Sequence, residues 1–282
     1  MRVARASSWA VFAFTLFVAR DALAYCRTTT CDPKAADCTK NDDGCIRDGA
    51  PLTWTSMPIT YRFQADGSSK LDSDATRVAV RAAFDAWSAI ECDAGRTSLR
   101  FEEGSDIQAD KPEDAVRAST PFGIYFRDDA WTHDDADESL ALTNVQYGLV
   151  TGTIDYADIE INTFENQFAL AGSDPGIDLQ AVVTHEVGHY IGLAHSTAKD
   201  SIMVARYCQS DKRCSGDVSS IRALSDDDVA AVCALYPPKG IGGVHRGAVA
   251  SPSGGCSTGG RPSWPLLGAA ALLFIVWRRR RR

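Results

Sequence analysis

The chain has 282 residues, of which 45% are hydrophobic, and its formal net charge is −8. This is the composition of a globular protein, and the length allows one medium-sized domain with appended segments. Between the two terminal segments, residues 25–255 hold 20 Lys and Arg against 36 Asp and Glu, a formal net charge of −16. Such a surface repels nucleic acid, so we exclude a nucleic-acid partner and expect an exported domain.

Residues 1–24 predict a secretory signal peptide. They begin with Arg2 and Arg5, continue with an apolar stretch and end in an A-x-A site at Ala24. These three parts together are typical of a signal peptide. The apolar stretch is shorter than the roughly 20 residues that cross a bilayer, so we expect cleavage after Ala24 rather than a membrane anchor.

The cysteines predict disulfides in an exported protein. An even number of cysteines behind a signal peptide indicates up to four disulfides. Eight of the nine lie upstream of the C-terminal tail: Cys26, Cys31, Cys38, Cys45, Cys92, Cys208, Cys214 and Cys233. The sequence does not give their pairing, although Cys208 and Cys214 are close enough in the chain to pair. The Cys-rich N-terminal segment, residues 25–51, lacks the paired C-x2-C spacing of a structural zinc site.

The next part of the chain predicts several strands and one helix. Alternating or β-branched and aromatic runs predict strands at residues 57–63, 99–101, 122–126 and 151–163. Residues 74–91 carry apolar side chains near helical spacing and predict a helix, with Ser73 or Asp74 as its cap. Strands with an early helix and a later one indicate an α/β or α+β domain.

An acidic segment, DDAWTHDDADES, surrounds His133. We favour a solvated loop here, and a calcium ion held by its carboxylates is the alternative. Its acidic residues are Asp128, Asp129, Asp134, Asp135, Asp137 and Glu138, which lack the regular spacing of an EF-hand. Further on, Asp155, Asp158 and Glu160 are expected to belong to a strand and its turn.

Three of the five histidines in the chain lie within HEVGHYIGLAHS, residues 185–196. Asp178 is a good N-cap for a helix from Leu179 to about Leu193. On this helix His185 and His189 are four residues apart and project from one face, where two imidazoles can hold one zinc ion. Glu186 is rotated by about 100° from His185, so we expect it beside the metal as a base and not as a ligand.

The third histidine has to return to the first two. Gly192 can adopt the left-handed conformation that ends a helix and reverses the chain, which brings His195 back. Three protein ligands leave the fourth zinc position to water, as in a catalytic site, whereas a structural site has four. A lone histidine is usually a surface or core residue, but the order H-E-x-x-H-x-x-G-x-x-H is specific.

This pattern resembles the zinc signature of the metzincin metallopeptidases, and Ser196 after the third histidine is similar to their matrixin branch. Met203, in DSIM at residues 200–203, stands where the family has its Met-turn, and Tyr207 also fits the matrixin pattern. The resemblance implies that Met203 forms an apolar floor under the zinc. It also implies a last helix in LSDDDVAAVCALY, residues 224–236, whose Asp227 and Asp228 help to anchor the Met-turn.

The resemblance extends over residues 52–238 and implies an α+β, metzincin-like fold. This fold is a twisted mixed sheet with an active-site helix and a C-terminal helix. It implies that the strand at residues 157–162 borders the cleft and pairs with an extended peptide. Residues after Met203 are expected to wall the pocket for the side chain that follows the cut.

Two matrixin features are missing from the sequence. No cysteine-switch motif precedes the domain; a block of the zinc by one of the four N-terminal cysteines is the alternative to their pairing in disulfides. The structural zinc of animal matrixins needs three histidines and an aspartate, and outside the signature only His133 and His245 remain. We therefore expect a single catalytic zinc ion.

The C-terminal end predicts sorting to the cell surface. Residues 239–263 are rich in Gly, Ser and Pro and predict a flexible linker. Residues 264–282 combine a short apolar stretch, flanked by tryptophans, with five terminal arginines, which is typical of a membrane stop. With Gly255-Cys256 upstream, this end resembles the myxobacterial-type sorting tails. The resemblance implies cleavage near Cys256 by a sorting protease and attachment to the cell surface; persistence as a transmembrane anchor is the alternative.

The sequence thus predicts a secreted or surface-attached zinc endopeptidase that acts on a polypeptide substrate. The expected ligands are His185, His189 and His195, Glu186 is the general base, and Gly192 and Met203 support the site. A non-catalytic zinc-containing surface binding module is the alternative, and a structural zinc domain with a fourth protein ligand is another. Retention of Glu186 favours the enzyme.

Overall fold

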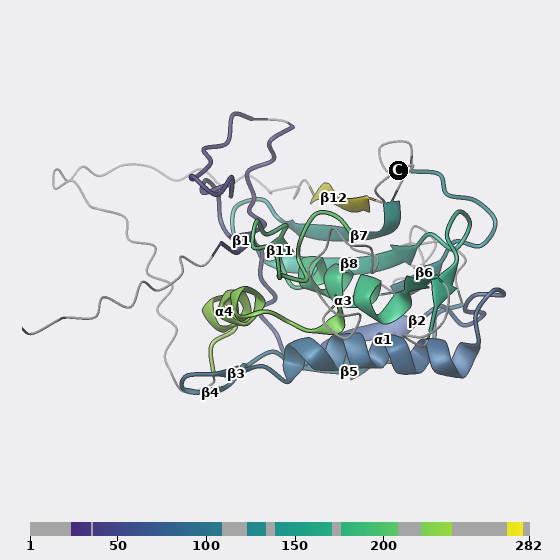
Figure 1. Cartoon of the computed structure of the whole chain (residues 1–282). Coiled ribbons are helices and arrows are strands. Elements are labelled where there is room, and N and C mark those ends of the chain that lie inside the picture. Colours follow the sequence, from purple (N-terminus) through teal and green to yellow (C-terminus); the bar gives the residue numbers. More distant parts are fainter. Residues whose placement is uncertain are drawn as a thin grey trace, which may run out of the picture.

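The domain is built on a mixed β-sheet whose one face carries the helices (Figure 1). A computed structural model describes residues 24–34, 36–108, 123–133, 139–170, 176–207 and 221–238, and the backbone of residues 270–278. The sheet has the strand order β12-β7-β8-β6-β2-β5. These strands are β2 (Ile59–Phe63), β5 (Phe101–Glu103), β6 (Gly123–Phe126), β7 (Ser139–Gly148), β8 (Ile154–Ile161) and β12 (Ala270–Arg278). β7 is antiparallel to both β8 and β12, and the other pairs are parallel.

Three helices and several two-residue strands complete the described fold. The helices are α1 (Ser73–Ser88), α3 (Leu179–Tyr190) and α4 (Asp226–Leu235). The short strands are β1 (Cys26–Arg27), β3 (Glu91–Cys92), β4 (Gly95–Arg96), β9 (Phe168–Ala169), β10 (Ile177–Asp178) and β11 (Leu193–Ala194). This confirms the predicted α+β fold with an active-site helix and a C-terminal helix.

Helix α1 differs from its predicted bounds at both ends. Asp72 is the N-cap and accepts a hydrogen bond from the Ala75 amide at 2.9 Å, in place of the expected Ser73 or Asp74. The helix ends at Ser88, because Glu91 and Cys92 form strand β3 in a hairpin with β4. Four predicted strands are present in β2, β5, β6 and β8, with bounds shifted by a few residues.

Strand β7 was not predicted from the sequence, and its presence corrects the expected position of the cleft. β8 pairs with β7 on one side and with β6 on the other, so residues 157–161 of the expected edge strand lie inside the sheet. The expectation that these residues border the cleft is therefore wrong. β7 lies between β8 and β12, and its residues are buried on both faces. Burial on both faces removes the period-2 alternation by which a strand is recognised.

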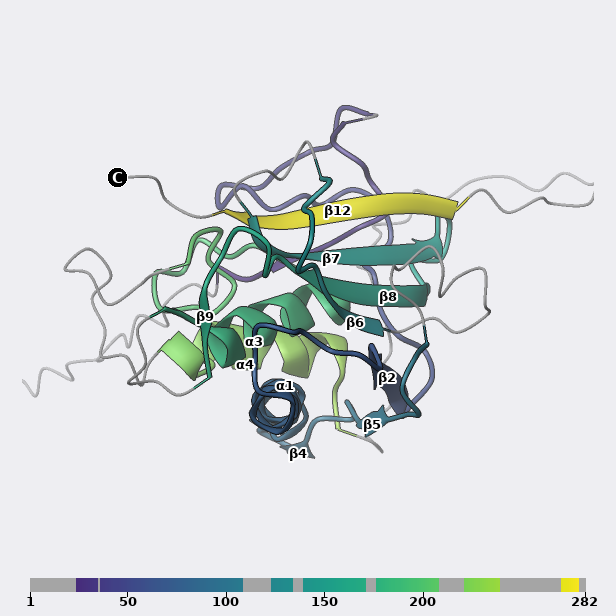
Figure 2. The same ribbon diagram turned by 90° about the vertical axis from the view of Figure 1, so that its right-hand side faces the viewer.

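The core lies between the sheet and helices α1 and α3. Phe84 of α1 stacks on Tyr61 of β2 with ring centroids 4.0 Å apart. Trp87, at the end of α1, is fully buried and donates its indole N–H to the carbonyl of Thr184 in α3 at 2.8 Å. The two helices are therefore held to the same face of the sheet (Figure 2), and α3 is fixed at the turn that carries the histidines.

The opposite face of β7 and β8 carries buried polar side chains. Asn144 donates to Asp158 at 2.8 Å and to Glu160 at 3.0 Å. Glu160 also pairs with Arg127 at 2.6 Å and lies 3.2 Å from Nε2 of His133. His133 is thus partly buried against a carboxylate, which corrects the expectation of a solvated loop histidine. Burial and the nearby Glu160 raise the pKa of Asp158 to about 7.

The calcium alternative for the acidic segment stays a prediction. Asp128 accepts hydrogen bonds from Ser68, Ser69 and Thr163, so other parts of the protein already use its oxygens. These hydrogen bonds outweigh burial and lower the pKa of Asp128. Residues 134–138 lie outside the described part of the chain.

Within the described residues, three disulfides join six of the eight cysteines. They are Cys26–Cys45, Cys31–Cys38 and Cys92–Cys233. The four N-terminal cysteines are all paired, which favours the disulfide interpretation over a thiol that blocks the zinc. Cys208 and Cys214 lie outside the described residues, so their pairing stays a prediction.

We expect mass spectrometry of the mature protein under non-reducing conditions to find no free thiol among the eight cysteines. Three pairs are within bonding distance, and an exported protein meets an oxidising environment. Alkylation before and after reduction counts the thiols, and digestion identifies the linked peptides. Two or more free thiols in the unreduced protein would contradict this expectation.

The N-terminal segment packs against the rest of the domain. β1 pairs with β11 in antiparallel orientation, and the Thr28 amide donates to the carbonyl of Gly192 at 2.9 Å. The amide of Leu52 then donates back to the carbonyl of Thr28 at 2.8 Å. Residues 24–51 therefore lie beside the turn that follows the active-site helix.

The apolar C-terminal segment contains strand β12, which lies along β7 in Figure 2. Within the described residues, no helix is long and apolar enough to cross a membrane. The expected signal peptide, residues 1–24, and the linker, residues 239–263, fall outside the described residues except for Ala24.

Candidate active site

Helix α3 presents the first two histidines from a buried position. Asp178 is its N-cap, as predicted, and accepts a hydrogen bond from the Ala181 amide at 2.9 Å. Both His185 and His189 are fully buried. At the other end, Trp54 donates its indole N–H to the carbonyl of Tyr190 at 2.7 Å. Asp178 also pairs with Arg222 at 2.6 Å, so the helix is tied to the surrounding protein at both ends.

The helix ends earlier than predicted, and Gly192 makes the turn. α3 ends at Tyr190, whereas the sequence predicted an end near Leu193. Gly192 has φ +94°, and a β-carbon on it would lie 2.1 Å from the carbonyl oxygen of Leu52. Only glycine fits this position, because a side chain would meet both the strained φ and the neighbouring backbone. The chain then runs through β11 to His195.

The three histidines come together as the sequence predicted. Their ligand nitrogens all lie within 4.8 Å of one another, and Nε2 of His189 is 3.2 Å from Nε2 of His195. Two nitrogens at zinc-bonding distance in a tetrahedral site are separated by about 3.3 Å. The donor set and its spacing therefore fit a zinc ion. Among the described residues, no fourth His, Cys, Asp or Glu joins this group.

Hydrogen bonds orient two of the imidazoles. Nδ1 of His185 donates to the carbonyl of Ile202 at 2.6 Å, and Nδ1 of His189 donates to the carbonyl of Leu193 at 2.9 Å. With the proton on Nδ1, the lone pair is on Nε2, which is the atom available to a metal. Backbone carbonyls thus select the tautomer that binds zinc.

The charge state of the histidines also favours metal binding. Burial, followed by repulsion from the neighbouring imidazoles, lowers the pKa of His185 and of His189 well below the usual range. Burial lowers the pKa of His195 to about 4. All three are therefore neutral at neutral pH, as a metal ligand must be.

Glu186 lies beside the histidines and does not belong to the ligand group. Its side chain is fully buried, and Oε2 accepts a hydrogen bond from Oγ1 of Thr143 at 2.6 Å. Burial raises its pKa to about 8, and the hydrogen bond from Thr143 opposes this shift. A divalent cation close by would favour the ionised carboxylate. This is the environment of a carboxyl group that exchanges a proton near neutral pH.

Met203 is buried against the active-site helix, and its expected role as an apolar floor under the zinc stays a prediction. A β-carbon on Gly188 of α3 would lie 2.2 Å from the sulfur of Met203, so this glycine allows the close contact. The segment is held by Asp228 of α4, which accepts hydrogen bonds from Ser201 Oγ at 2.6 Å and from the Ile202 amide at 3.0 Å. Ile202 in turn orients His185 through its carbonyl.

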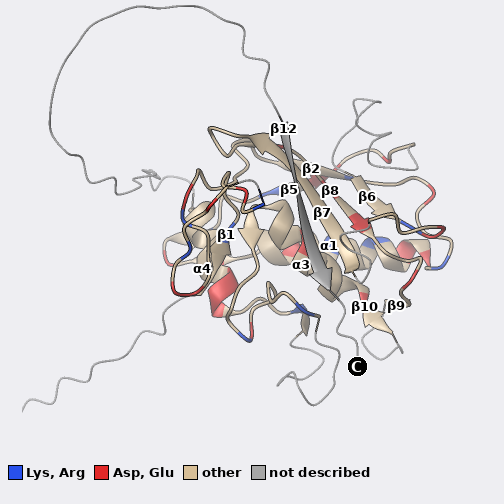
Figure 3. Cartoon of the chain, turned by 90° about the horizontal axis from the view of Figure 1, so that it is seen from above, with Lys and Arg blue, Asp and Glu red and all other residues tan. Residues whose placement is uncertain are grey.

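The first turn of α4 is acidic (Figure 3), and it contacts both Ala24, the last residue of the expected signal peptide, and the residue after the third histidine. Asp227 accepts hydrogen bonds from the Ala24 amide at 2.6 Å and from Ser196 Oγ at 2.7 Å. Ser196 directly follows the third histidine. Of the two aspartates expected to anchor the Met-turn, Asp228 therefore has contacts with that segment, whereas the side-chain hydrogen bonds of Asp227 go to Ala24 and Ser196.

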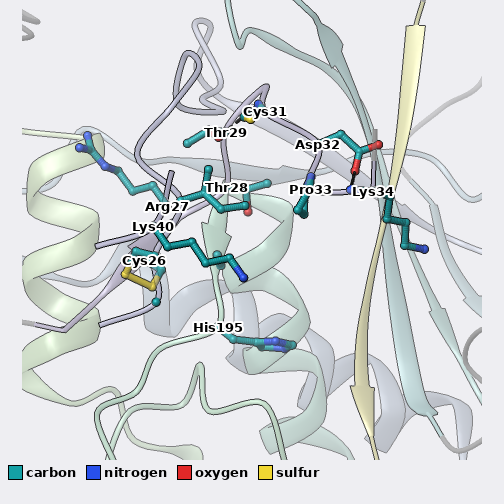
Figure 4. A pocket seen from close by; sticks show the side chains of 14 residues that line it. Cys26, Arg27, Thr28, Thr29, Cys31, Asp32, Pro33, Lys34, Lys40 and His195 are labelled. Atoms are coloured by element: carbon teal, nitrogen blue, oxygen red, sulfur yellow. Dashed lines mark hydrogen bonds between the residues drawn. A yellow bond between two sulfur atoms is a disulfide. The ribbon is translucent and has the colours of Figure 1, made fainter. Parts of the chain in front are cut away.

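A cavity of about 340 Å³ lies between the Cys-rich segment and His195. Figure 4 shows Lys40 and His195 on the same cavity, with Thr28 and the Cys26 disulfide beside them. The N-terminal segment therefore forms one wall next to the third histidine. The wall expected after Met203 is described only to Tyr207, whose hydroxyl accepts a hydrogen bond from the Asp178 amide at 2.8 Å.

The sequence analysis missed two residues of the site, Gly188 and Thr143. An isolated glycine inside a helix, such as Gly188, is a signal of close packing that could have been used. Thr143 lies on a strand that was itself not predicted, so its contact with Glu186 had no visible signal.

This α+β fold and its three-histidine site define a domain of the zinc metallopeptidase class. The family model described as Matrixin matches residues 53–237. The chain belongs to the matrixin family, whose members are zinc enzymes.

Curated relatives share this domain at moderate identity. Matrix metalloproteinase-C of Caenorhabditis elegans is 30% identical over 65% of this chain and 28% of its own length. The hatching enzyme of Paracentrotus lividus is 28% identical over 66% of this chain and 26% of its own. Human matrix metalloproteinase-25 is 29% identical over 65% of this chain and 29% of its own. The chain thus spans less than a third of the length of these three relatives.

Proposed function

We propose that the protein is a secreted or surface-attached, zinc-dependent endopeptidase in which Glu186 is the general base. The observation that carries the proposal is that a set of three histidines and the carboxyl group of Glu186 occur in the same site. Three neutral histidines form an incomplete ligand set, and next to them is a carboxyl group that is not a ligand. A purely structural zinc centre would use a fourth protein ligand, and none is found among the described residues.

The residues divide the chemistry between binding and proton transfer. His185, His189 and His195 would hold the zinc ion through their Nε2 atoms. Zinc, when bound, supplies a Lewis acid that polarises the scissile carbonyl and lowers the pKa of the attacking water. Glu186 takes the proton of that water and then delivers it to the nitrogen of the leaving amine.

We place the substrate along the outer edge of β7, in place of the strand first expected. Thr143 of β7 contacts Glu186, so this strand is next to the base. An extended peptide can add to the edge of a sheet through backbone hydrogen bonds. β12 now pairs with this edge, and its Ile275 is opposite Thr143. The edge therefore accepts an extended chain, and β12 competes with the substrate for it.

In this proposal the two terminal segments bring the protein to the cell surface. The signal peptide would be removed after Ala24, and the C-terminal segment would contact the membrane until a sorting protease cuts near Cys256. Residues 270–278 cannot contact the membrane and pair with β7 at the same time, so either the membrane contact or the cut would free the edge of β7. A polypeptide substrate at the cell surface is the expected partner of the processed protein.

Removal of residues 256–282 is expected to raise kcat/KM for peptide cleavage several-fold or more. The reason is that the substrate no longer has to displace β12 from the edge of β7 before it can bind there. The measurement compares the full chain with a chain that ends at Gly255, both zinc-loaded and in the same detergent buffer.

Both lengths carrying Glu186→Ala serve as the control for contaminating proteases. Equal kcat/KM for the two lengths would contradict the proposed competition at β7. Recovery of mature surface protein with Arg278–Arg282 still attached would contradict the processing step.

A further inference from the structure

Thr143 stands out on β7 because it is a buried polar residue on an apolar face. Side chains two residues apart point to the same face of a strand, and Thr143 lies between Ala141 and Val145, which belong to the core under the helices. Its own exposed fraction is 0%. A hydroxyl buried in such a place is costly unless it is hydrogen-bonded, and the partner of this one is Glu186.

The distances indicate which atom accepts the hydrogen bond from the hydroxyl group of Thr143. Thr143 Oγ1 is 2.6 Å from Oε2 of Glu186 and 3.1 Å from the backbone carbonyl oxygen of the same residue. A hydroxyl has one hydrogen to donate, and the shorter distance is typical of a bond to a carboxylate. Thr143 therefore donates to the side chain of Glu186.

The two carboxylate oxygens of Glu186 are in different situations. Oε2 is held by Thr143, whereas Oε1 is buried and has no hydrogen-bond partner among the described residues. The terminal torsion of a glutamate is otherwise loosely defined, so a single bond to one oxygen fixes where the other one lies. Thr143 is a suitable anchor because its β-branched side chain is stiff and sits inside the sheet.

We propose that Thr143 is a positioning residue, which holds Oε2 of Glu186 so that Oε1 is directed at the attacking water. This inference rests on the proposed role of Glu186 as the general base. The side-chain hydrogen bonds of Thr143 go to Glu186, and Thr143 does not belong to the group of metal-binding side chains, so in this proposal it acts through the orientation of Glu186. Its effect should therefore appear in the chemical step and not in zinc or substrate binding.

The test compares Thr143→Val with Thr143→Ser in the zinc-loaded protein. Valine keeps the shape and removes the hydroxyl, whereas serine keeps the hydroxyl. We expect Thr143→Val to lower kcat by about 10- to 100-fold, because a hydrogen bond to a charged group is lost. KM and the zinc content should stay at the parental values, and Thr143→Ser should restore most of kcat.

Thr97→Val is the matched control, because Thr97 is also fully buried and donates to the carbonyl of Tyr236 at 2.7 Å, away from the histidines. It should lower stability and leave kcat per zinc-loaded molecule unchanged. Parental kcat in Thr143→Val, or an equal loss in Thr143→Val and Thr143→Ser, would overturn the proposal.

Glu186→Ala separates a failure of this inference from a failure of the proposed function. If Glu186→Ala is inactive and Thr143→Val is fully active, only the proposed role of Thr143 is refuted. A fully active Glu186→Ala removes the general base and the positioning role together.

Discussion

Glu186→Ala is expected to keep the zinc and the fold but to lower peptide cleavage by about 10²–10⁴-fold, the usual contribution of a general base. The ligands are histidines, so the metal should remain in place. Without the carboxyl group, the group that Thr143 holds and that would accept the proton of the water is lost. The measurement is zinc content beside kcat/KM on a peptide substrate for the variant and the parent.

Glu103→Ala is the control, because Glu103 forms ion pairs with Arg77 and Arg81 at the surface, away from the zinc site. It should retain parental cleavage. If Glu186→Ala cleaves at the parental rate, the peptidase mechanism fails. If the parent binds zinc and cuts no peptide, the binding-module interpretation replaces it.

His195→Ala should have a different effect, because it removes one of three protein ligands. We expect zinc affinity to fall by more than about 100-fold, since even the loss of an outer hydrogen-bond partner can cost that much. Cleavage should fall with zinc occupancy and recover in part at high zinc concentration. Competition with a chromogenic chelator measures the affinity, and cleavage is recorded over a zinc titration.

His133→Ala is the matched histidine control, since His133 lies against Glu160 on the other face of the sheet. Its zinc affinity should equal that of the parent. Parental zinc affinity in His195→Ala would exclude His195 as a ligand.

The zinc site was predictable because its information is local. His185, Glu186 and His189 lie on one helix, and their relative directions follow from helical geometry alone. Gly192 added the one turn needed for His195, and in the structure the three histidines lie together. The fold class followed from the same local patterns together with the family resemblance.

The parts that failed depend on contacts distant in sequence. β7 has no alternation because both of its faces are buried, so neither the strand nor the contact between Thr143 and Glu186 was visible. The disulfide Cys92–Cys233 joins residues 141 positions apart, and no local rule selects that pair. The end of α3 was placed about three residues too late, and the Leu52 backbone that lies against Gly192 beyond this end is distant in sequence.

The disulfide Cys26–Cys45 has a consequence for when the site is completed. It secures β1, which pairs with the two residues directly before His195. In a reducing cytosol this bond does not persist, and the strand beside the third ligand loses its covalent tether. We therefore expect oxidation of this cysteine pair to act as a maturation step, which links the finished three-histidine site to an oxidising compartment.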